Sequence, residues 1–391
     1  MEEWKEYKLG EIAQIQTGPF GSQLHKSDYV DDGVPCIMPT NIGKNLDVIS
    51  DGIAHISEND AQRLSRHLVT AGDIIYARRG DIEKCAYIQE QQNGWFCGTG
   101  CLRIRINKDA DSHFIAYQLS TSEAKSWIVG NAVGTTMLNL NSSILSDLPV
   151  LLPSLFTQRH ITAILKSLDD KIEVNRRINE NLEQQAQALF KSWFVDFEPF
   201  KDGEFVESEL GMIPKGCSVK KLMNICTIKY GKGISKNELV NEGFPVFGGN
   251  GIIGFHEKYL YELPQILVSC RGAASGKIME SYPMSFVTSN SLVLELFNRL
   301  YYNYLKCYLM RNPLYDYATG SAQPQITIDN IKNVPILIPS EGVLEHVDYL
   351  FESIYKKQWE LIQESGDLAE LRDTLLPRLM SGELKVGEVN V

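Results

Sequence analysis

The segment GTTMLNLNSSILSDLPVLLP, residues 134–153, decides the architecture, because a related segment, GSAQPQITIDNIKNVPILIP, recurs at residues 320–339. The shift is 186 residues, and it continues without a gap from residues 161–193 to residues 347–379. Self-similarity at a fixed offset is the signature of a structural unit that is built more than once. We therefore expect two similar globular parts, each followed by the same kind of element.

Heptad spacing predicts a long helix after the first copy. Ten positions, separated alternately by four and three residues, run from Ile161 to Trp193, and eight of them are apolar. This alternation is the pattern of a coiled-coil seam. The seam positions are Ile161, Leu165, Leu168, Ile172, Asn175, Asn179, Leu182, Ala186, Leu189 and Trp193.

The second copy repeats this seam, with seven of its ten positions apolar. They are Val347, Phe351, Ile354, Gln358, Leu361, Ser365, Leu368, Arg372, Leu375 and Leu379. Polar residues lie near the middle of both seams, namely Asn175 and Asn179 in the first and Gln358 and Ser365 in the second. A buried polar residue in a seam fixes the register of the helices at a cost in stability.

Two such helices in one chain most simply pair with each other in antiparallel fashion, since a twofold axis through the pair would then exchange the two copies. At 1.5 Å per residue each seam is roughly 50 Å long. The pair would hold the two globular parts apart and set their spacing. The alternative is that each helix packs only on its own globular part.

The globular parts also match each other. WKEYKLGEIAQIQTG (residues 4–18) aligns with CSVKKLMNICTIKYG (217–231), and GDIIYARRG (72–80) aligns with PQILVSCRG (264–272). Short apolar runs between glycine, asparagine and proline predict strands and turns in both copies. Helices are predicted at 114–128 and 300–310.

The predicted fold class is therefore α+β, with two similar globular α/β domains separated by two long antiparallel coiled-coil helices in a pseudo-twofold internal repeat. The predicted segments are a first domain at 1–150, a first spacer helix at 151–198, an irregular linker at 199–216, a second domain at 217–335, and a second spacer helix with a C-terminal tail at 336–391.

The composition is that of an ordinary globular protein, with 43% hydrophobic and 22% charged residues. No run of 18 apolar residues predicts a membrane span, and the charged N-terminus lacks the apolar core of a signal peptide, so we expect a cytoplasmic protein without membrane contact. The eight cysteines form no zinc-binding pattern and are expected to be reduced. The net charge of −11 argues against nucleic acid, yet residues 217–335 hold twelve Lys and Arg against eight Asp and Glu, which leaves room for a local basic surface.

Several strings resemble enzyme motifs but lack the surroundings that the chemistry needs. GNGIIG (249–254) matches the dinucleotide fingerprint without a following helix, so we predict a loop. GAASGK (272–277) is one residue shorter than a phosphate-binding loop and is followed by Ile278 instead of a magnesium-binding hydroxyl. NPLY (312–315) resembles an amino-methyltransferase signature but has no glycine-rich cofactor loop before it. We find no catalytic or metal-binding constellation and expect a protein that is not an enzyme.

Polar residues that recur at equivalent places in the two copies are the remaining candidates for a binding site. Basic residues follow an apolar run in each copy, and hydroxyl or amide residues precede each long helix. Arginine and lysine bind phosphates and guanine, whereas asparagine and glutamine bind adenine. The alternative for each residue is a solvated turn. The predicted DNA-contacting residues are Arg78, Arg79, Lys84, Thr135, Thr136, Asn139, Lys232, Arg271, Lys277, Ser321, Gln323 and Gln325.

In this order, and present twice, the motifs resemble those of the specificity (S) subunits of type I restriction-modification systems. The resemblance covers nearly the whole chain. Two departures are Cys217, which stands where the first copy has Trp4, and EGVLEHVDYLF in the second copy, where the first has TQRHITAIL. The motifs that carry the resemblance are WKEYKLGEIAQIQTG, GDIIYARRG, ILVSCRGAASGK, SELGMIPKGCSVKKL, LRDTLLPRLMSGEL and the run from LNSSILSDLPVLLP into the first long helix.

The resemblance implies that each globular part is a target-recognition domain that reads one half of a split sequence on double-stranded DNA, while the paired helices set the unread gap. It implies no cofactor and no catalysis in this chain. The implied partners are two modification subunits, which methylate adenine with S-adenosylmethionine, and two restriction subunits, which translocate and cut DNA with ATP and Mg. The alternative is a bivalent, non-catalytic protein adaptor that does not bind DNA.

Overall fold

A computed structural model describes residues 4–107, 110–134, 138–320 and 323–388, and the chain divides into two compact units. Unit 1 comprises Met1–Asn175 and Gln363–Val391, and unit 2 comprises Arg176–Ile362. Each unit thus contains one globular part and one half of each long helix. This division differs from the sequence segments, because the end of the chain belongs to the first unit.

Unit 1 is built on a four-stranded antiparallel sheet in the order β2-β9-β6-β7, with a second sheet in the order β3-β5-β4-β8. In the second sheet β4 and β8 are parallel. The strands are β1 (Lys5–Lys8), β2 (Ala13–Thr17), β3 (Tyr29–Val30), β4 (Val34–Ile37), β5 (Ala54–Ile56), β6 (Ile74–Ala77), β7 (Cys85–Tyr87), β8 (Phe96–Cys97), β9 (Cys101–Ile106) and β10 (Pro149–Leu152). The short helices are α1 (Leu9–Ile12), α2 (Glu58–Arg63), α3 (Ser112–Leu119), α4 (Ser122–Asn131) and α5 (Ser142–Ser146).

Unit 2 repeats this topology. Its four-stranded sheet has the order β14-β20-β17-β18, and its second sheet, β16-β15-β19, again contains one parallel pair, β15 with β19. The strand pair β13-β21 corresponds to β1-β10 of unit 1. The elements are β13 (Ser218–Lys221), β14 (Cys226–Tyr230), β15 (Phe244–Gly248), β16 (Gly251–His256), β17 (Ile266–Ser269), β18 (Ile278–Glu280), β19 (Phe286–Val287), β20 (Ser291–Leu296), β21 (Pro335–Ile338), α7 (Tyr302–Arg311) and α8 (Ile328–Ile331).

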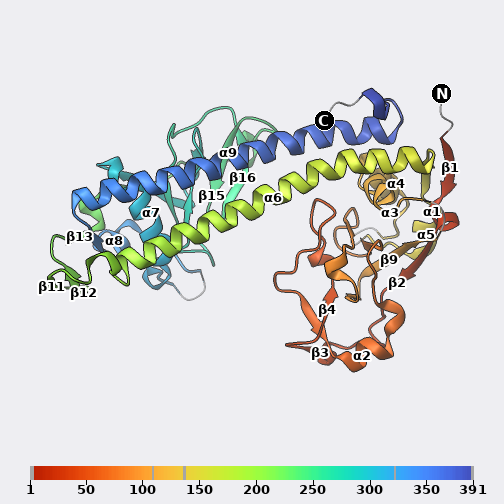
Figure 1. Cartoon of the computed structure of the whole chain (residues 1–391), viewed down its shortest axis with the longest axis horizontal. Helices are drawn as coiled ribbons and strands as arrows, with labels where there is room; N and C mark the ends of the chain where they lie inside the picture. The colour runs from red at the N-terminus through yellow and green to blue at the C-terminus, as the bar shows by residue number, and fades with distance from the viewer. Residues whose placement is uncertain (1–3, 108–109, 135–137, 321–322, 389–391) are drawn as a thin grey trace. The chain divides into compact units, whose positions relative to one another are not determined.

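Two helices of 40 residues each, α6 (Leu155–Phe194) and α9 (Glu341–Met380), carry the predicted seams (Figure 1). In unit 1, Asp169 contacts Arg372, and Asn175 contacts Ser365. In unit 2, Asn179 accepts a hydrogen bond from Gln358, and the ring of Trp193 stacks on that of His346. Residue numbers rise along α6 as those of its partners on α9 fall, so the helices are antiparallel. The alternative in which each helix packs only on its own globular part is therefore excluded.

The seams are the buried stripes of these helices. Every seam position, all of them within the described ranges, is buried or half-buried. Ile161, Leu165 and Leu168 join the core of unit 1 together with Leu375 and Leu379 of the other helix. Burial of these apolar side chains is the main force that holds the two helices together. The predicted α+β fold class with paired antiparallel helices is confirmed.

Three segments differ in detail from the sequence prediction. The helix expected at 114–128 is two helices, α3 and α4, because the hydroxyl of Thr121 accepts a hydrogen bond from the backbone NH of Ala124 and caps a new helix. The linker expected to be irregular contains a hairpin of β11 (Phe205–Ser208) and β12 (Gly211–Pro214), with Gly211 at a φ of 89°. The GNGIIG loop is the turn between β15 and β16 and the first part of β16.

In the described part of the chain, no helix combines the length and apolarity needed to cross a membrane.

Candidate nucleic-acid interface

The predicted contact residues of unit 1 that the structure describes, Arg78, Arg79, Lys84 and Asn139, lie at one end of its four-stranded sheet. β2 and β6 both pair antiparallel with β9, with Thr17 opposite Leu102 and Ala77 opposite Cys101. The carboxyl ends of β2 and β6 therefore meet at the start of β9. The loops that leave these two strands begin at Gly18 and Arg78 and lie side by side.

Arg78 connects three segments of this surface. Its Nε donates to Oδ1 of Asn139 at 3.2 Å and to the carbonyl of Leu140 at 3.2 Å. Its guanidinium lies over the ring of Phe20, 5.4 Å from the ring centroid. Burial, and then the nearby charge of Arg79, lower the pKa of Arg78. The guanidinium is thus held in place while the remaining donors stay available to a ligand.

The neighbouring Arg79 is exposed, and its backbone forms an antiparallel bridge with Asn139. Asn139 in turn exchanges two backbone hydrogen bonds with Val133, at 2.9 and 3.2 Å. These bonds hold Val133 and Asn139 together beside the arginines. The predicted contacts Thr135 and Thr136 lie outside the described residues.

Unit 2 holds its loops in the same way. Arg271 is exposed and forms an antiparallel bridge with Gln325, which exchanges two backbone hydrogen bonds of 2.8 Å with Thr319. The side chains of Gln323 and Gln325 are exposed. Ser321 lies outside the described residues. The pairing predicted from the repeat, Asn139 with Gln325, therefore places each residue on the arginine loop of its own unit.

The three predicted lysines have different surroundings. Lys84 lies 3.4 Å from the carboxylate of Asp81 in its own loop, which offsets its charge. Lys277 donates to Oδ1 of Asn250 at 2.7 Å, so its charge is held but not neutralised. Lys232 is exposed next to the turn that follows β19.

The electrostatics of the loops favour an anionic ligand. Within the described ranges, no carboxylate lies within ion-pair distance of Arg79, Arg271 or Lys232. The Arg271–Lys277 loop contains no acidic residue, whereas the Arg78–Lys84 loop also contains Asp81 and Glu83. Basic side chains without carboxylate partners are the chemistry that binds nucleic-acid phosphates.

Two aromatic residues on these surfaces were not predicted. Phe20, whose side chain is 56% exposed, lies under Arg78 in the sequence Gly-Pro-Phe-Gly. Tyr315 is exposed and follows Leu314, whose backbone NH donates to Gly276 of the basic loop. The sequence signal for these exposed rings was an aromatic residue in a glycine- or proline-rich turn, because such a turn offers no side chains that could bury the ring.

The described part of the chain is predicted to hold no metal site, and some of its acidic side chains are engaged in structural contacts, such as that of Asp73. It contains no group of three or more His, Cys, Asp or Glu side chains that could hold a metal ion. Asp73 is buried and accepts two hydrogen bonds from Arg105, at 2.6 and 2.7 Å, and one from the backbone NH of Thr70 at 2.8 Å. This carboxylate is engaged in holding β6 to β9.

Comparison with known proteins identifies the family. The family model for the type I restriction modification DNA specificity domain matches residues 1–184 and again residues 214–363. The chain belongs to the type I restriction-modification specificity subunits. It is 27% identical to the MjaIX specificity subunit of Methanocaldococcus jannaschii over 99% of this chain and 95% of that protein. It is 25% identical to the HindI specificity subunit of Haemophilus influenzae over 98% of this chain and 100% of that protein.

The fold is that of a solved specificity subunit. The crystal structure of the type I restriction-modification S subunit from M. genitalium aligns with 97% of this chain and 96% of its own chain. The TM-score is 0.57 and the sequence identity is 18%. The twofold match of the family model agrees with the internal repeat, since each match contains one globular part.

The two loop sets of this specificity subunit share a backbone but not their side chains. The place of Arg78 is taken in unit 2 by Cys270, which is buried and donates its thiol to the carbonyl of Ser289 at 3.5 Å. Burial raises the pKa of this thiol, so it stays neutral. Asn139 corresponds to the longer amide of Gln325. The two units therefore present different chemistry on the same scaffold.

Proposed function

We propose that this specificity subunit reads a bipartite sequence on double-stranded DNA, one half with each unit, and has no catalytic activity of its own. The observation that carries the proposal is the repeated loop pair, Arg79 with Asn139 and Arg271 with Gln325. In both units an exposed arginine without a carboxylate partner is bridged to an amide residue at the same end of the same sheet. The paired helices, in this proposal, set the unread gap.

The chemistry of these loops matches the edges of base pairs in the major groove. Arginine binds guanine O6 and N7, and asparagine or glutamine binds adenine N6 and N7. Lysines and hydroxyl groups bind phosphates and fix the register of the protein on the duplex. The proposed contacts are Arg78, Arg79, Lys84, Thr135, Thr136, Asn139, Lys232, Arg271, Lys277, Ser321, Gln323 and Gln325.

Catalysis would belong to partner subunits in the cytoplasm. We propose two modification subunits, which supply S-adenosylmethionine, and two restriction subunits, which supply ATP and Mg. We place these partners on the long helices, where Phe156 of α6 is 72% exposed and Tyr349 of α9 is 73% exposed.

The test is the methylation pattern that the chain directs. A cell without its own type I system would express a modification subunit with this chain, without it, or with a variant carrying both Arg79→Ala and Arg271→Ala. Sequencing of methylated adenines should then show a bipartite motif only with the unmodified chain. A bivalent adaptor that does not bind DNA predicts instead that the chain purifies with its partner and leaves the methylation pattern unchanged.

A further inference from the structure

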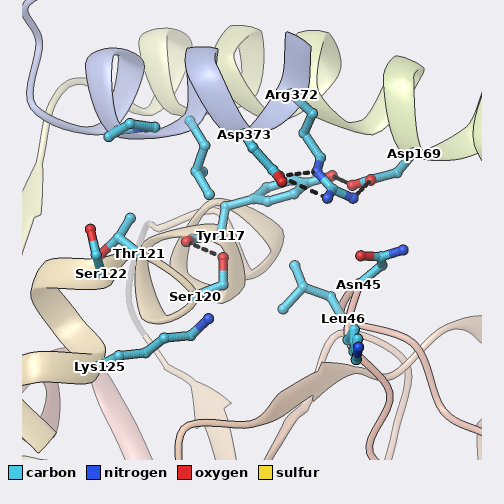
Figure 2. Close-up of a pocket in the computed structure, with 13 residues that line it drawn as sticks. Asn45, Leu46, Tyr117, Ser120, Thr121, Ser122, Lys125, Asp169, Arg372 and Asp373 are labelled. Carbon is cyan, nitrogen blue, oxygen red and sulfur yellow. Dashed lines mark hydrogen bonds and ion pairs between the residues drawn. The ribbon is translucent and has the colours of Figure 1, made fainter. Parts of the chain in front are cut away.

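A polar network in unit 1 ties its globular part to both long helices (Figure 2). The hydroxyl of Tyr117 on α3 donates to Oδ2 of Asp169 on α6 at 2.5 Å. The other oxygen of Asp169 accepts a hydrogen bond from Nη1 of Arg372 on α9 at 2.8 Å. One carboxylate thus connects three elements that are far apart in the sequence.

Arg372 is the one charged residue among the seam positions, and only 12% of its side chain is exposed. Its second contact is Asp373, at 2.8 Å. Burial opposes the charge of Arg372, but the hydrogen bonds that it donates to Asp169 and Asp373 raise its pKa overall. A buried charge is tolerated only when it is paired, and Asp169 is the partner of Arg372 that lies on the other helix.

Tyr117 keeps its proton in these surroundings. Burial, and then the charge of Asp169, raise the pKa of its hydroxyl. The hydroxyl is therefore always a donor to Asp169, and the link does not change near neutral pH. Asp169, which accepts the hydrogen bond of the phenol, is held in turn by its hydrogen bond from Arg372.

A second polar attachment joins the start of α3 to α6. Here the carboxylate of Asp111 accepts a hydrogen bond from Thr162 at 3.0 Å, and its backbone NH donates to Gln158 at 2.9 Å. Thr162 and Asp169 are separated by about 10 Å along α6. The two attachments add directional hydrogen bonds at both ends of α3 to the apolar packing between these helices, and so restrict the angle between them.

Apolar packing also joins α3 to the helix pair, because Tyr117 lies in the same core as Leu168 and Leu375. A cavity of about 410 Å³ borders the network, between the first turn of α4, the Lys44–Leu46 loop and α9 (Figure 2). Lys125 and Pro377 also line it. On the side of this cavity, the polar network supplies the directional contacts from α3 to both long helices.

We propose that Tyr117, Asp169 and Arg372 are positioning residues that fix the angle of the first recognition domain on the helix pair, and thereby restrict the gap length that the subunit accepts between its two half-sites. The proposal rests on the proposed function. A change of one base pair in the gap moves a half-site by about 3.4 Å and rotates it by about 34° around the duplex. A domain held at a fixed angle cannot follow such a rotation, whereas one that pivots can.

The experiment uses the complete complex with modification subunits and DNA duplexes that keep both half-sites while the gap changes by one base pair at a time. The unmodified complex should methylate one gap length. In complexes with Tyr117→Phe or Asp169→Asn, we expect methylation of the adjacent gap lengths to rise at least tenfold relative to the original gap. Discrimination against single base changes within either half-site should remain as in the unmodified complex.

Two further variants separate positioning from general stability. Arg372→Lys keeps a cation beside Asp169 and should retain the narrow gap preference. Asp373→Asn changes a contact of Arg372 that does not reach α3, and should also leave the preference unchanged. An unchanged gap profile in Tyr117→Phe and Asp169→Asn, or a parallel loss of gap and base discrimination, would overturn the proposal. Failure of the unmodified complex to methylate any bipartite target would instead overturn the proposed function.

Discussion

Replacement of Arg271 by alanine should relax recognition in one half-site and leave the other intact. The side chain is exposed on a loop without acidic residues, and its backbone is fixed by the bridge to Gln325. The fold therefore loses nothing when the side chain is shortened. Arg79 occupies the equivalent place in unit 1, so Arg79→Ala should affect only the other half-site.

The size of the effect depends on what the guanidinium contacts. A bidentate contact with guanine is worth about 1–3 kcal/mol, so its loss would reduce discrimination at one base pair roughly 5- to 150-fold. A phosphate contact carries no sequence information. Its loss would weaken binding to all sequences alike and reduce the slope of log affinity against log salt by about 0.9. We expect the first outcome, because the exposed amide of Gln325 lies on the segment that bridges to Arg271.

The assay is the initial methylation rate of the reconstituted complex on duplexes that each carry one substituted base pair. Salt titrations of duplex binding would accompany it. Lys221→Ala is the matched control, since it removes one exposed positive charge from β13 of the same unit. Equal relaxation of both half-sites, or no change at any position while binding and its salt dependence also persist, would refute the assignment of the loop as a reader.

Three further predictions concern the scaffold. Gly231→Ala would place a Cβ 2.3 Å from the backbone oxygen of Thr288 and should lower the free energy of unfolding by about 1–3 kcal/mol. Gly233→Ala is the control, because open space surrounds this position and the free energy of unfolding should not fall. Urea unfolding of the two variants tests this. Asn175→Leu removes a fully buried amide whose Oδ1 has no hydrogen-bond partner, but it also removes the hydrogen bonds from Nδ2 to Glu364 and Ser365, so the denaturation midpoint should change by an amount equivalent to less than about 1 kcal/mol. Burial, and then nearby arginines, lower the pKa of His67 to about 4. The stabilising contribution of neutral His67 should therefore be complete above pH 6.5 and fall by about 3 kcal/mol towards pH 4. His67→Phe should reduce this loss, which unfolding measured across this pH range would test.

The architecture was predictable because its main determinants are periodic. Apolar residues at heptad spacing can be buried only along one stripe of a helix, and the stripe from Ile161 to Trp193 is the one that α6 buries. The repeat also predicted the equivalence of Asn139 and Gln325, which both bridge to an arginine loop. The division at Thr121 into α3 and α4 was missed, because the capping hydroxyl lies within an otherwise continuous helical pattern.

The surroundings of the candidate site were less predictable because they depend on contacts between distant segments. Lys84 and Asp81 are three residues apart, so their pairing could have been anticipated from the sequence. Lys277 and Asn250 are separated by 27 residues, and nothing in either segment indicates the other. The hydrogen bond between Arg78 and Asn139 spans 61 residues and requires the complete sheet to bring its partners together.

The difference between backbone contacts that hold a loop and side chains that are exposed on it predicts which substitutions change recognition without changing the fold. The bridge at Gln325 uses only its backbone NH and carbonyl, both bonded to Thr319, while its side chain is exposed. Gln325→Asn should therefore change the free energy of unfolding by less than about 0.5 kcal/mol. It should nevertheless alter base preference in the half-site read by unit 2, because the shorter amide reaches a different depth in the groove. Motif sequencing together with thermal unfolding of the variant measures both, and a stable variant that directs an unchanged motif would remove Gln325 from the reading surface.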